Sequence, residues 1–172
     1  TLDTTTRQLY LADADRTVSL SDTVGFIRDL PHGLVEAFQA TLQEAADADL
    51  LLHGVAAASP AWREQIDEVL RVLADIGAEE LPQILVFNKL DALEASQRPR
   101  ERVDRFELTP HRSASRVFVS AAQGEGLDDL RRLVADAALG LSEEACTPAP
   151  IHGSGVAEAE APFPMNTTVL VA

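Results

Sequence analysis

Three short polar motifs each follow a run of apolar and β-branched residues. Asp22 and Gly25 come after "RTVSL", the motif "NKLD" comes after "QILVF", and Ser120 closes "RVFVS". Ligand sites of α/β proteins form at the carboxyl ends of strands, so these motifs are candidates for one site. An aspartate there could face a metal-bound phosphate, and a glycine lets a backbone N–H approach because it has no Cβ. Each motif alone could be an ordinary turn, but their order along one chain favours the functional interpretation.

Composition and charge limit the class of protein. The chain has 172 residues, 46% of them hydrophobic, which is enough for one domain with a core. A formal net charge of −14 argues against gripping a nucleic-acid backbone unaided, because phosphate contacts need clustered Lys and Arg. Cys146 is the only cysteine, so no intrachain disulfide forms. The single cysteine is compatible with a reducing compartment, and no apolar run is long enough to span a bilayer, so we expect a cytoplasmic protein. We expect it to be a monomer. We also expect a piece of a longer protein, since the chain opens on Thr1.

The elements that must position these motifs alternate between strands and helices. We expect an antiparallel hairpin from strands at 7–12 and 16–20, further strands at 49–58, 83–87 and 116–120, and helices at 34–48, 60–76 and 127–139. Ser59 and Pro60 are expected to be the N-cap and first residue of the second helix. This alternation predicts a mainly parallel α/β sheet.

Two segments carry weaker signals. The Arg-rich "SQRPRERVDR" is expected to be a solvated loop or helix face. Beyond Leu141 the residues turn to Ala, Pro, Gly and Glu, which predicts a linker or disordered tail over 141–172, although "TTVLVA" at its end could form a stray strand. We therefore expect one domain over 1–140 and a tail over 141–172.

The motifs "TLDTTTRQL", "DTVGFIRDLPHGLVEAFQATLQEA", "DLLLH" and "NKLD" together resemble the HflX-type GTPases of the P-loop NTPase superfamily. The resemblance covers about 1–140, and "DTVGFIRDLPH" is its most specific part. It implies an α/β fold, a Ras-like P-loop GTPase sheet with flanking helices. It also implies a protein that binds and hydrolyses GTP with Mg²⁺, associates with the large ribosomal subunit, and splits or rescues stalled ribosomes.

The resemblance assigns the base-binding roles to two loops. Asp91 would accept hydrogen bonds from the guanine N1–H and exocyclic amine, and the Ser120–Ala121 backbone would donate to guanine O6. Asn88 would tie the two loops together, and Lys89 would lay its stem along the nucleotide. Adenine presents the wrong donors and acceptors to such a site.

The phosphate-binding roles fall in the first part of the chain. By resemblance, Asp22 would hold Mg²⁺ through water, Gly25 would donate its N–H to the γ-phosphate, and Thr1 would ligate Mg²⁺ in the triphosphate state. Phe26 stands where the Ras-like pattern has a glutamine that orients the attacking water. Because a phenyl ring cannot orient water, we expect slow hydrolysis until a partner rearranges the site.

The main phosphate-binding loop of the superfamily is missing. Its pattern G-x-x-x-x-G-K-[ST] needs a lysine, and the sole lysine, Lys89, already lies in "NKLD". The resemblance implies that this loop follows a central strand, so we expect an incomplete sheet that lacks the first strand and the phosphate loop. Without the N–H groups and lysine of this loop, we expect weak nucleotide binding by this chain alone. The strands that begin near Arg16 and Asp49 should have unpaired backbone edges, which predicts poor folding.

Departures from the family pattern leave alternatives open. Thr4 stands in place of a usual proline, Gly54 falls within a buried strand, and Ala56 replaces an aspartate. The chain could instead come from another translation-factor-like GTPase, serving ribosome assembly or tRNA modification. It could also be a degenerate interaction module that hydrolyses nothing.

Overall fold

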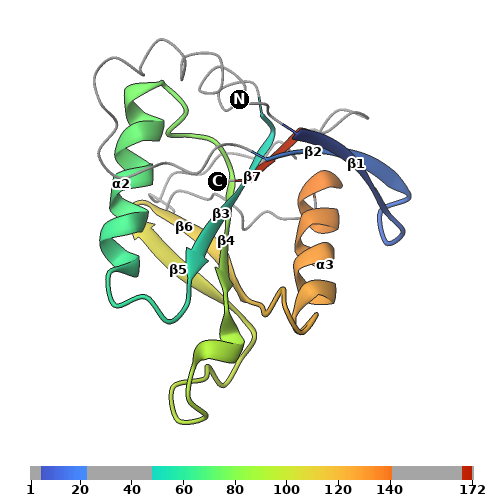
Figure 1. The fold of residues 1–172 in the computed structure, drawn as a ribbon. Coiled ribbons are helices and arrows are strands. Elements are labelled where there is room, and N and C mark those ends of the chain that lie inside the picture. The colour runs from blue at the N-terminus through green and yellow to red at the C-terminus, as the bar shows by residue number, and fades with distance from the viewer. Residues whose placement is uncertain (1–4, 23–47, 141–167, 172) are drawn as a thin grey trace, which may run out of the picture.

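The computed structural model describes residues 5–22, 48–140 and 168–171. Its strands are β1 (Thr5–Leu11), β2 (Arg16–Asp22), β3 (Leu50–Ala56), β4 (Gln83–Asn88), β5 (Val103–Thr109), β6 (Arg112–Phe118) and β7 (Thr168–Val171). Its helices are α2 (Trp62–Asp75), α3 (Leu127–Ala138) and the short 3₁₀ helix η1 (Leu90–Ala92). The two α-helices cover opposite faces of one sheet (Figure 1).

The seven strands form a single sheet in the order β1-β2-β7-β3-β4-β6-β5. The five inner strands are mutually parallel, and the outer strands β1 and β5 pair antiparallel with their neighbours. The carboxyl ends of β2, β7, β3, β4 and β6 therefore share one edge of the sheet. This is the edge at which ligand sites of parallel sheets form.

Strand β3 shows how the sheet separates two cores. Its successive side chains point to opposite faces. Leu50 and Leu52 pack in the cluster that includes the buried residues of α3, whereas Leu51 and Val55 pack in clusters that include α2. An apolar run without polar alternation therefore forms a strand because helices cover both faces.

Helix α2 begins later than predicted. Its N-cap is Ala61, which makes no side-chain capping bond, and the Ser59 hydroxyl instead accepts from the Ala61 N–H at 3.3 Å. The expectation that Ser59 caps the helix is therefore wrong, because Ser59 lies in the preceding turn. The predicted end is confirmed, since Gly77 takes the left-handed conformation at φ +72° after the C-cap Ile76.

The segment predicted as a solvated loop or helix face contains part of a strand. Residues from Val103 onward form β5, which pairs antiparallel with β6. Its charged residues are interspersed with Val103, Phe106 and Leu108, which are partly buried, Val103 against one core cluster and Phe106 and Leu108 against another. The strand lies at the sheet edge, where charged residues are well tolerated.

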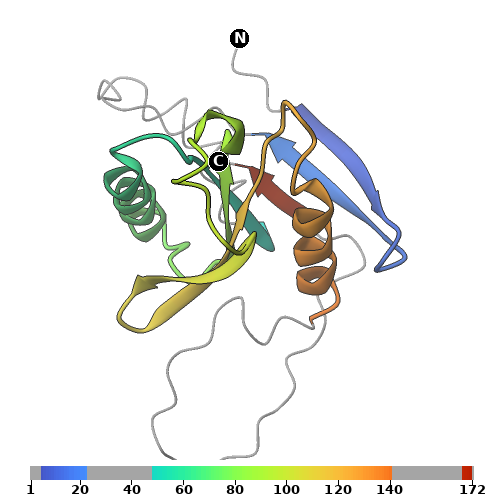
Figure 2. The ribbon, with the colours of Figure 1, turned by 90° about the horizontal axis from the view of Figure 1, so that it is seen from below.

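The C-terminal strand lies in the middle of the sheet. Figure 2 shows β7 in red between β2 in blue and β3 in teal, and the pairing of β7 with both is parallel. The expectation that the strands starting near Arg16 and Asp49 have unpaired inner edges is therefore wrong. A strand was expected at this end of the chain, but its position between β2 and β3 was not. The division into a domain over 1–140 and a tail over 141–172 stays a prediction.

The other predicted elements agree with the structure where it describes them. The hairpin of β1 and β2, the strands β3 and β4, and helix α3 are confirmed, with Gly140 left-handed after α3. Strand β6 is predicted at 116–120 but spans Arg112–Phe118, so Ser120 lies two residues beyond its end. Gly54 does not break β3, and it is exposed, not buried. The helix predicted at 34–48 and the departure at Thr4 lie outside the described residues.

Candidate functional site

The side chain of Asn88 joins two loops at the carboxyl edge of the sheet. Its Oδ1 accepts hydrogen bonds from the Lys89 N–H at 2.7 Å and from the Ala121 N–H at 3.1 Å. The backbone adds a third link, because the Leu90 N–H donates to the Val119 carbonyl at 3.0 Å. The loop after β4 and the loop after β6 are thereby held in one fixed arrangement.

Lys89 has a left-handed backbone conformation, with φ 66° and ψ 39°. This conformation costs a non-glycine residue about 1–2 kcal/mol. It occurs at the N-cap of η1, where the Lys89 N–H reaches the side chain of Asn88, while the lysine side chain is exposed. Backbone strain of this kind persists where surrounding contacts enforce it, and it clusters at functional sites.

Asp91 is held by the neighbouring loop. The buried Ser120 hydroxyl donates to Asp91 Oδ1 at 2.5 Å. This hydrogen bond is the main reason why the pKa of the Asp91 carboxyl lies below its ordinary value. The carboxylate is exposed, negatively charged near neutral pH, and able only to accept hydrogen bonds.

A tight turn shapes the loop after β6. The Ser120 N–H donates to the Glu125 carbonyl at 2.9 Å, and the Glu125 N–H donates to the Ser120 carbonyl at 3.2 Å. Gly126 follows with φ +77°, and a Cβ there would lie 2.4 Å from the Phe118 carbonyl oxygen. Our sequence reasoning missed Gly126, although the spacing "GEG" directly before a helix was a signal for it.

Two arginines from the segment after η1 form ion pairs at the same turn. Arg102 pairs with Glu125 at 3.2 Å and with Asp129 at 3.6 Å, and Arg98 pairs with Glu125 at 3.4 Å. These side chains are partly exposed, so each pair contributes little alone. Their shared effect is to connect the segment that follows "NKLD" with the loop that contains Ala121.

Of the residues predicted to lie near the phosphates, Asp22 is the one that the structure describes. Asp22 ends β2, is exposed, and lies level with Val171 of β7 in the register. It shares the carboxyl edge with Asn88, but β7 and β3 lie between their strands, so the two residues are at opposite ends of the candidate site. Gly25, Phe26 and Thr1 lie outside the described residues. The assigned roles of Thr1, Asp22, Gly25, Asn88, Lys89, Asp91, Ser120 and Ala121 remain predictions.

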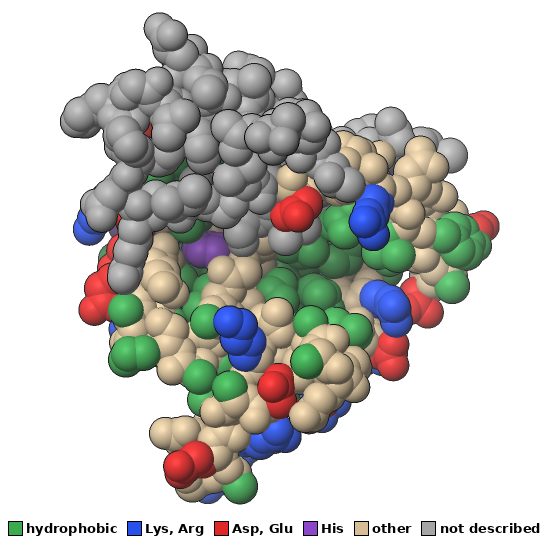
Figure 3. All heavy atoms as spheres, viewed as in Figure 1, with side chains coloured by type: hydrophobic (Ala, Val, Ile, Leu, Met, Phe, Trp, Pro, Cys, Tyr) green, Lys and Arg blue, Asp and Glu red, His purple; other side chains and the backbone are tan. Residues whose placement is uncertain are grey.

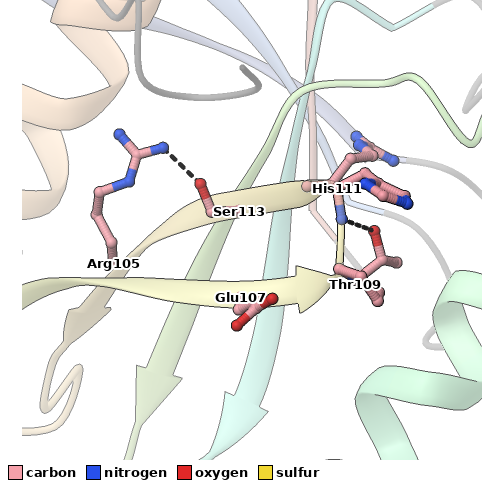
Figure 4. A pocket seen from close by; sticks show the side chains of 7 residues that line it. Arg105, Glu107, Thr109, His111 and Ser113 are labelled. Atoms are coloured by element: carbon pink, nitrogen blue, oxygen red, sulfur yellow. Dashed lines mark hydrogen bonds between the residues drawn. The ribbon is translucent and has the colours of Figure 1, made fainter. Parts of the chain in front are cut away.

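A separate pocket lies at the hairpin of β5 and β6 (Figure 4). Its volume is about 330 Å³, and its lining includes Arg105, Glu107, His111 and Ser113. Arg105 Nη2 donates to Ser113 Oγ at 2.5 Å. The pocket is at the start of β6, whereas the loop that contains Ser120 and Ala121 follows the end of β6, so the pocket lies toward the opposite end of the strands.

The described surface mixes charges of both signs. Figure 3 shows Lys and Arg side chains interspersed with Asp and Glu around hydrophobic side chains. This face therefore lacks, among the residues described, the continuous basic stripe that phosphate backbones require. In the described parts of the chain, no helix has the length and apolar character needed to cross a membrane.

Residues 1–89 match the family described as 50S ribosome-binding GTPase. The chain belongs to this family. The match includes the hairpin of β1 and β2, strands β3 and β4, and the first half of "NKLD".

Curated relatives agree with this GTPase family. The chain is 48% identical over 130 residues to GTPase HflX of Escherichia coli strain K12, and the match covers 76% of this chain and 29% of the relative. It is 46% identical over 130 residues to GTPase HflX of Caldanaerobacter subterraneus, covering 76% and 27%. The resemblance to the HflX type is confirmed, and the chain spans less than a third of the length of these relatives.

A solved structure shares the fold. It is a GTP-binding protein from the archaeon Sulfolobus solfataricus in complex with GDP, with a TM-score of 0.59 and 23% identity over 76% of this chain and 42% of that chain. The predicted fold class is confirmed as an α/β GTPase sheet with flanking helices. Its predicted incompleteness concerns the phosphate loop, for which the sequence has no lysine outside "NKLD".

Proposed function

We propose that this chain is the guanine-recognising part of an HflX-type GTPase and that the loops after β4 and β6 bind the base of GTP and GDP. The observation that supports this most is the set of side-chain contacts that hold these two loops in place. Asn88 holds the Ala121 N–H and the Lys89 N–H, and Ser120 holds Asp91. Loops that are held by such contacts lose less free energy to ordering when a base binds.

Guanine fits the chemistry of Asp91. The carboxylate only accepts, and guanine offers two donors side by side, its N1–H and its exocyclic amine. Adenine offers an acceptor at N1, which would face the carboxylate and leave both groups unpaired. Where the bound base covers the carboxylate, leaving it unpaired rejects the analogue by large factors, up to about 10⁴–10⁵.

Asp22 is the described residue that fits a role near the phosphates and Mg²⁺. Mg²⁺ keeps several waters and is usually bound through one or two carboxylates together with substrate phosphates. The described residues contain no group of three or more His, Cys, Asp or Glu that could hold a metal alone. We therefore propose that Asp22 supports Mg²⁺ through water, with Thr1 as a further ligand, and that the ion neutralises phosphate charge.

Hydrolysis and partner binding follow the HflX-type assignment. We propose GTP hydrolysis that is slow alone and faster on the large ribosomal subunit, because Phe26 cannot orient water. Association with the large subunit and the splitting or rescue of stalled ribosomes belong to the longer protein. The 41–48% identity to proteins named GTPase HflX favours this over another translation-factor-like GTPase. Cytoplasmic location and a monomeric state stay predictions.

The base site is tested by NMR titration of the whole 172-residue chain with GDP and with ADP up to millimolar concentration. We expect GDP, and not ADP, to shift the amide signals of Ala121 and Lys89. Asp91→Asn should reverse the order of GDP and xanthosine diphosphate, since the C2 oxygen of xanthine accepts from an amide donor. Asp128→Asn, on the exposed start of α3, should leave the order unchanged. Equal responses to GDP and ADP, or an unchanged order in Asp91→Asn, would refute the assignment.

A further inference from the structure

Strand β7 connects two parts of the sheet that are not otherwise paired among the described strands. On one side, Ser19 to Asp22 of β2 lie opposite Thr168 to Val171. On the other, Leu50 to Leu52 of β3 lie opposite Val169 to Val171. Both pairings are parallel, so β7 occupies an inner position between a two-stranded hairpin and a four-stranded sheet.

Each of the two strands beside β7 is also held by contacts with other elements. The hairpin of β1 and β2 packs on α3, because Leu11 and Val18 are buried in the same cluster as Val134, and Arg16 donates to the Ala138 carbonyl at 2.9 Å. Strand β3 is held on its other side by six register pairs with β4. The space between β2 and β3 therefore has two strand edges whose positions do not depend on β7 alone.

The residues of β7 suit an inner strand. Thr168, Val169 and Val171 are β-branched, and neither charge nor proline interrupts the four residues. An inner strand bonds to both neighbours, so each of its interior N–H groups is committed to one ladder or the other.

We propose that the space between β2 and β3 is an acceptor site for a single parallel, apolar β-strand, and that residues 168–171 of this chain are its occupant. The inserted strand joins the hairpin that ends at Asp22 to the strands that position the loops after β4 and β6. This proposal concerns strand insertion and does not depend on the proposed binding of nucleotide.

Hydrogen–deuterium exchange on the full chain, without nucleotide, tests the insertion. In the unmodified chain, amides of 169–171 should exchange slowly and together with those of 19–22. Leu170→Pro removes one ladder N–H and should speed exchange in 19–22 and 50–52 by about tenfold or more. Two matched controls should not: Leu170→Val keeps the N–H, and Ala157→Pro places proline in the same C-terminal segment outside β7.

Rescue in trans tests the acceptor site itself. A peptide of residues 165–172, titrated to millimolar concentration, should restore slow exchange in 19–22 and 50–52 of the Leu170→Pro chain, while the same peptide with proline at position 170 should not. If Leu170→Pro unfolds, the unmodified chain decides: fast exchange of 169–171, or exchange unrelated to that of 19–22, overturns the proposal. Unaltered exchange in a folded Leu170→Pro chain, or the absence of rescue in it, overturns the proposal as well.

Discussion

His53 should make the stability of this protein fall in mild acid. The side chain is 1% exposed on β3, and its strand position puts it on the same face as Leu51 and Val55, toward α2. Its Nδ1 has no hydrogen-bond partner, and neither does either amide atom of the equally buried Gln83. Burial lowers the pKa of His53 from 6.5 to about 4, against a smaller opposite effect of Gln83. The imidazole is therefore neutral in the folded chain at pH 7.

The size of the effect follows from this difference in pKa. The unfolded chain binds a proton at His53 as pH falls through 6.5, whereas the folded chain binds it only near pH 4. The stabilising contribution is thus complete above pH 6.5 and is lost as pH falls from 6.5 to 4. Linkage gives a loss of about 2 kcal/mol at pH 5 and about 3 kcal/mol below pH 4.

Urea unfolding at several pH values between 7.5 and 5 measures this loss. We expect the free energy of unfolding to fall by about 2 kcal/mol across this range in the unmodified chain, and His53→Leu to remove most of that fall. His111→Leu, at an exposed position on the β5–β6 turn, is the matched control and should keep it. If His53→Leu retains the full pH dependence, or if the unmodified chain shows none, the reasoning about buried, neutral His53 is refuted.

Two further predictions concern the supports of the fold and the site. Gly126→Ala places a Cβ 2.4 Å from a backbone carbonyl oxygen, so it should cost at least about 2 kcal/mol more in urea unfolding than Gly124→Ala, where φ is also positive but no atom lies within 4 Å. Equal losses for the two glycines would contradict the close approach. Asp104→Ala removes two hydrogen bonds, at 2.8 and 2.6 Å, to the half-buried Arg116 and should lower the free energy of unfolding by about 1–3 kcal/mol. Asp128→Ala, at a side chain that is 91% exposed, should lower it by less than about 0.5 kcal/mol. Thermal unfolding of both variants checks this. If Asp104→Ala costs nothing, the aromatic rings of Phe106 and Phe118 near the Arg116 guanidinium hold the arginine without its partner.

The meeting of the loops after β4 and β6 could be predicted because the signals for it are local. In "NKLD" and "SAA", polar residues directly follow apolar runs that can only be buried strands, and parallel strands bring such positions to one edge. The structure adds what the motifs do not contain, namely which atoms hold the loops together. That Asn88 accepts from the backbone of Ala121 depends on two segments 33 residues apart, and no spacing within either motif specifies it.

Strand β5 was missed because its pattern is governed by its neighbours. Its sequence "VDRFELT" has three charged residues among seven, which alone indicates a solvated segment. In the fold, contacts with the neighbouring strand β6 stabilise these charged side chains. Asp104 pairs with Arg116 of β6, and the Arg116 guanidinium lies 5.2 Å from the centre of the Phe106 ring and 4.9 Å from that of Phe118. Charged side chains in an edge strand are thus stabilised by cross-strand contacts that become visible only once the pairing is known.

The place of β7 shows the limit of reasoning from local pattern. A four-residue apolar run indicates a strand but carries no information about which edges it joins, because parallel pairing does not depend on nearness in sequence. The absence of the phosphate loop was read correctly, yet the inference that two strand edges would therefore stay unpaired did not follow. Unpaired inner edges carry a free-energy cost that any compatible segment of the chain can relieve. A gap in a sheet should therefore be analysed together with every apolar run the chain still contains, including runs far away in sequence.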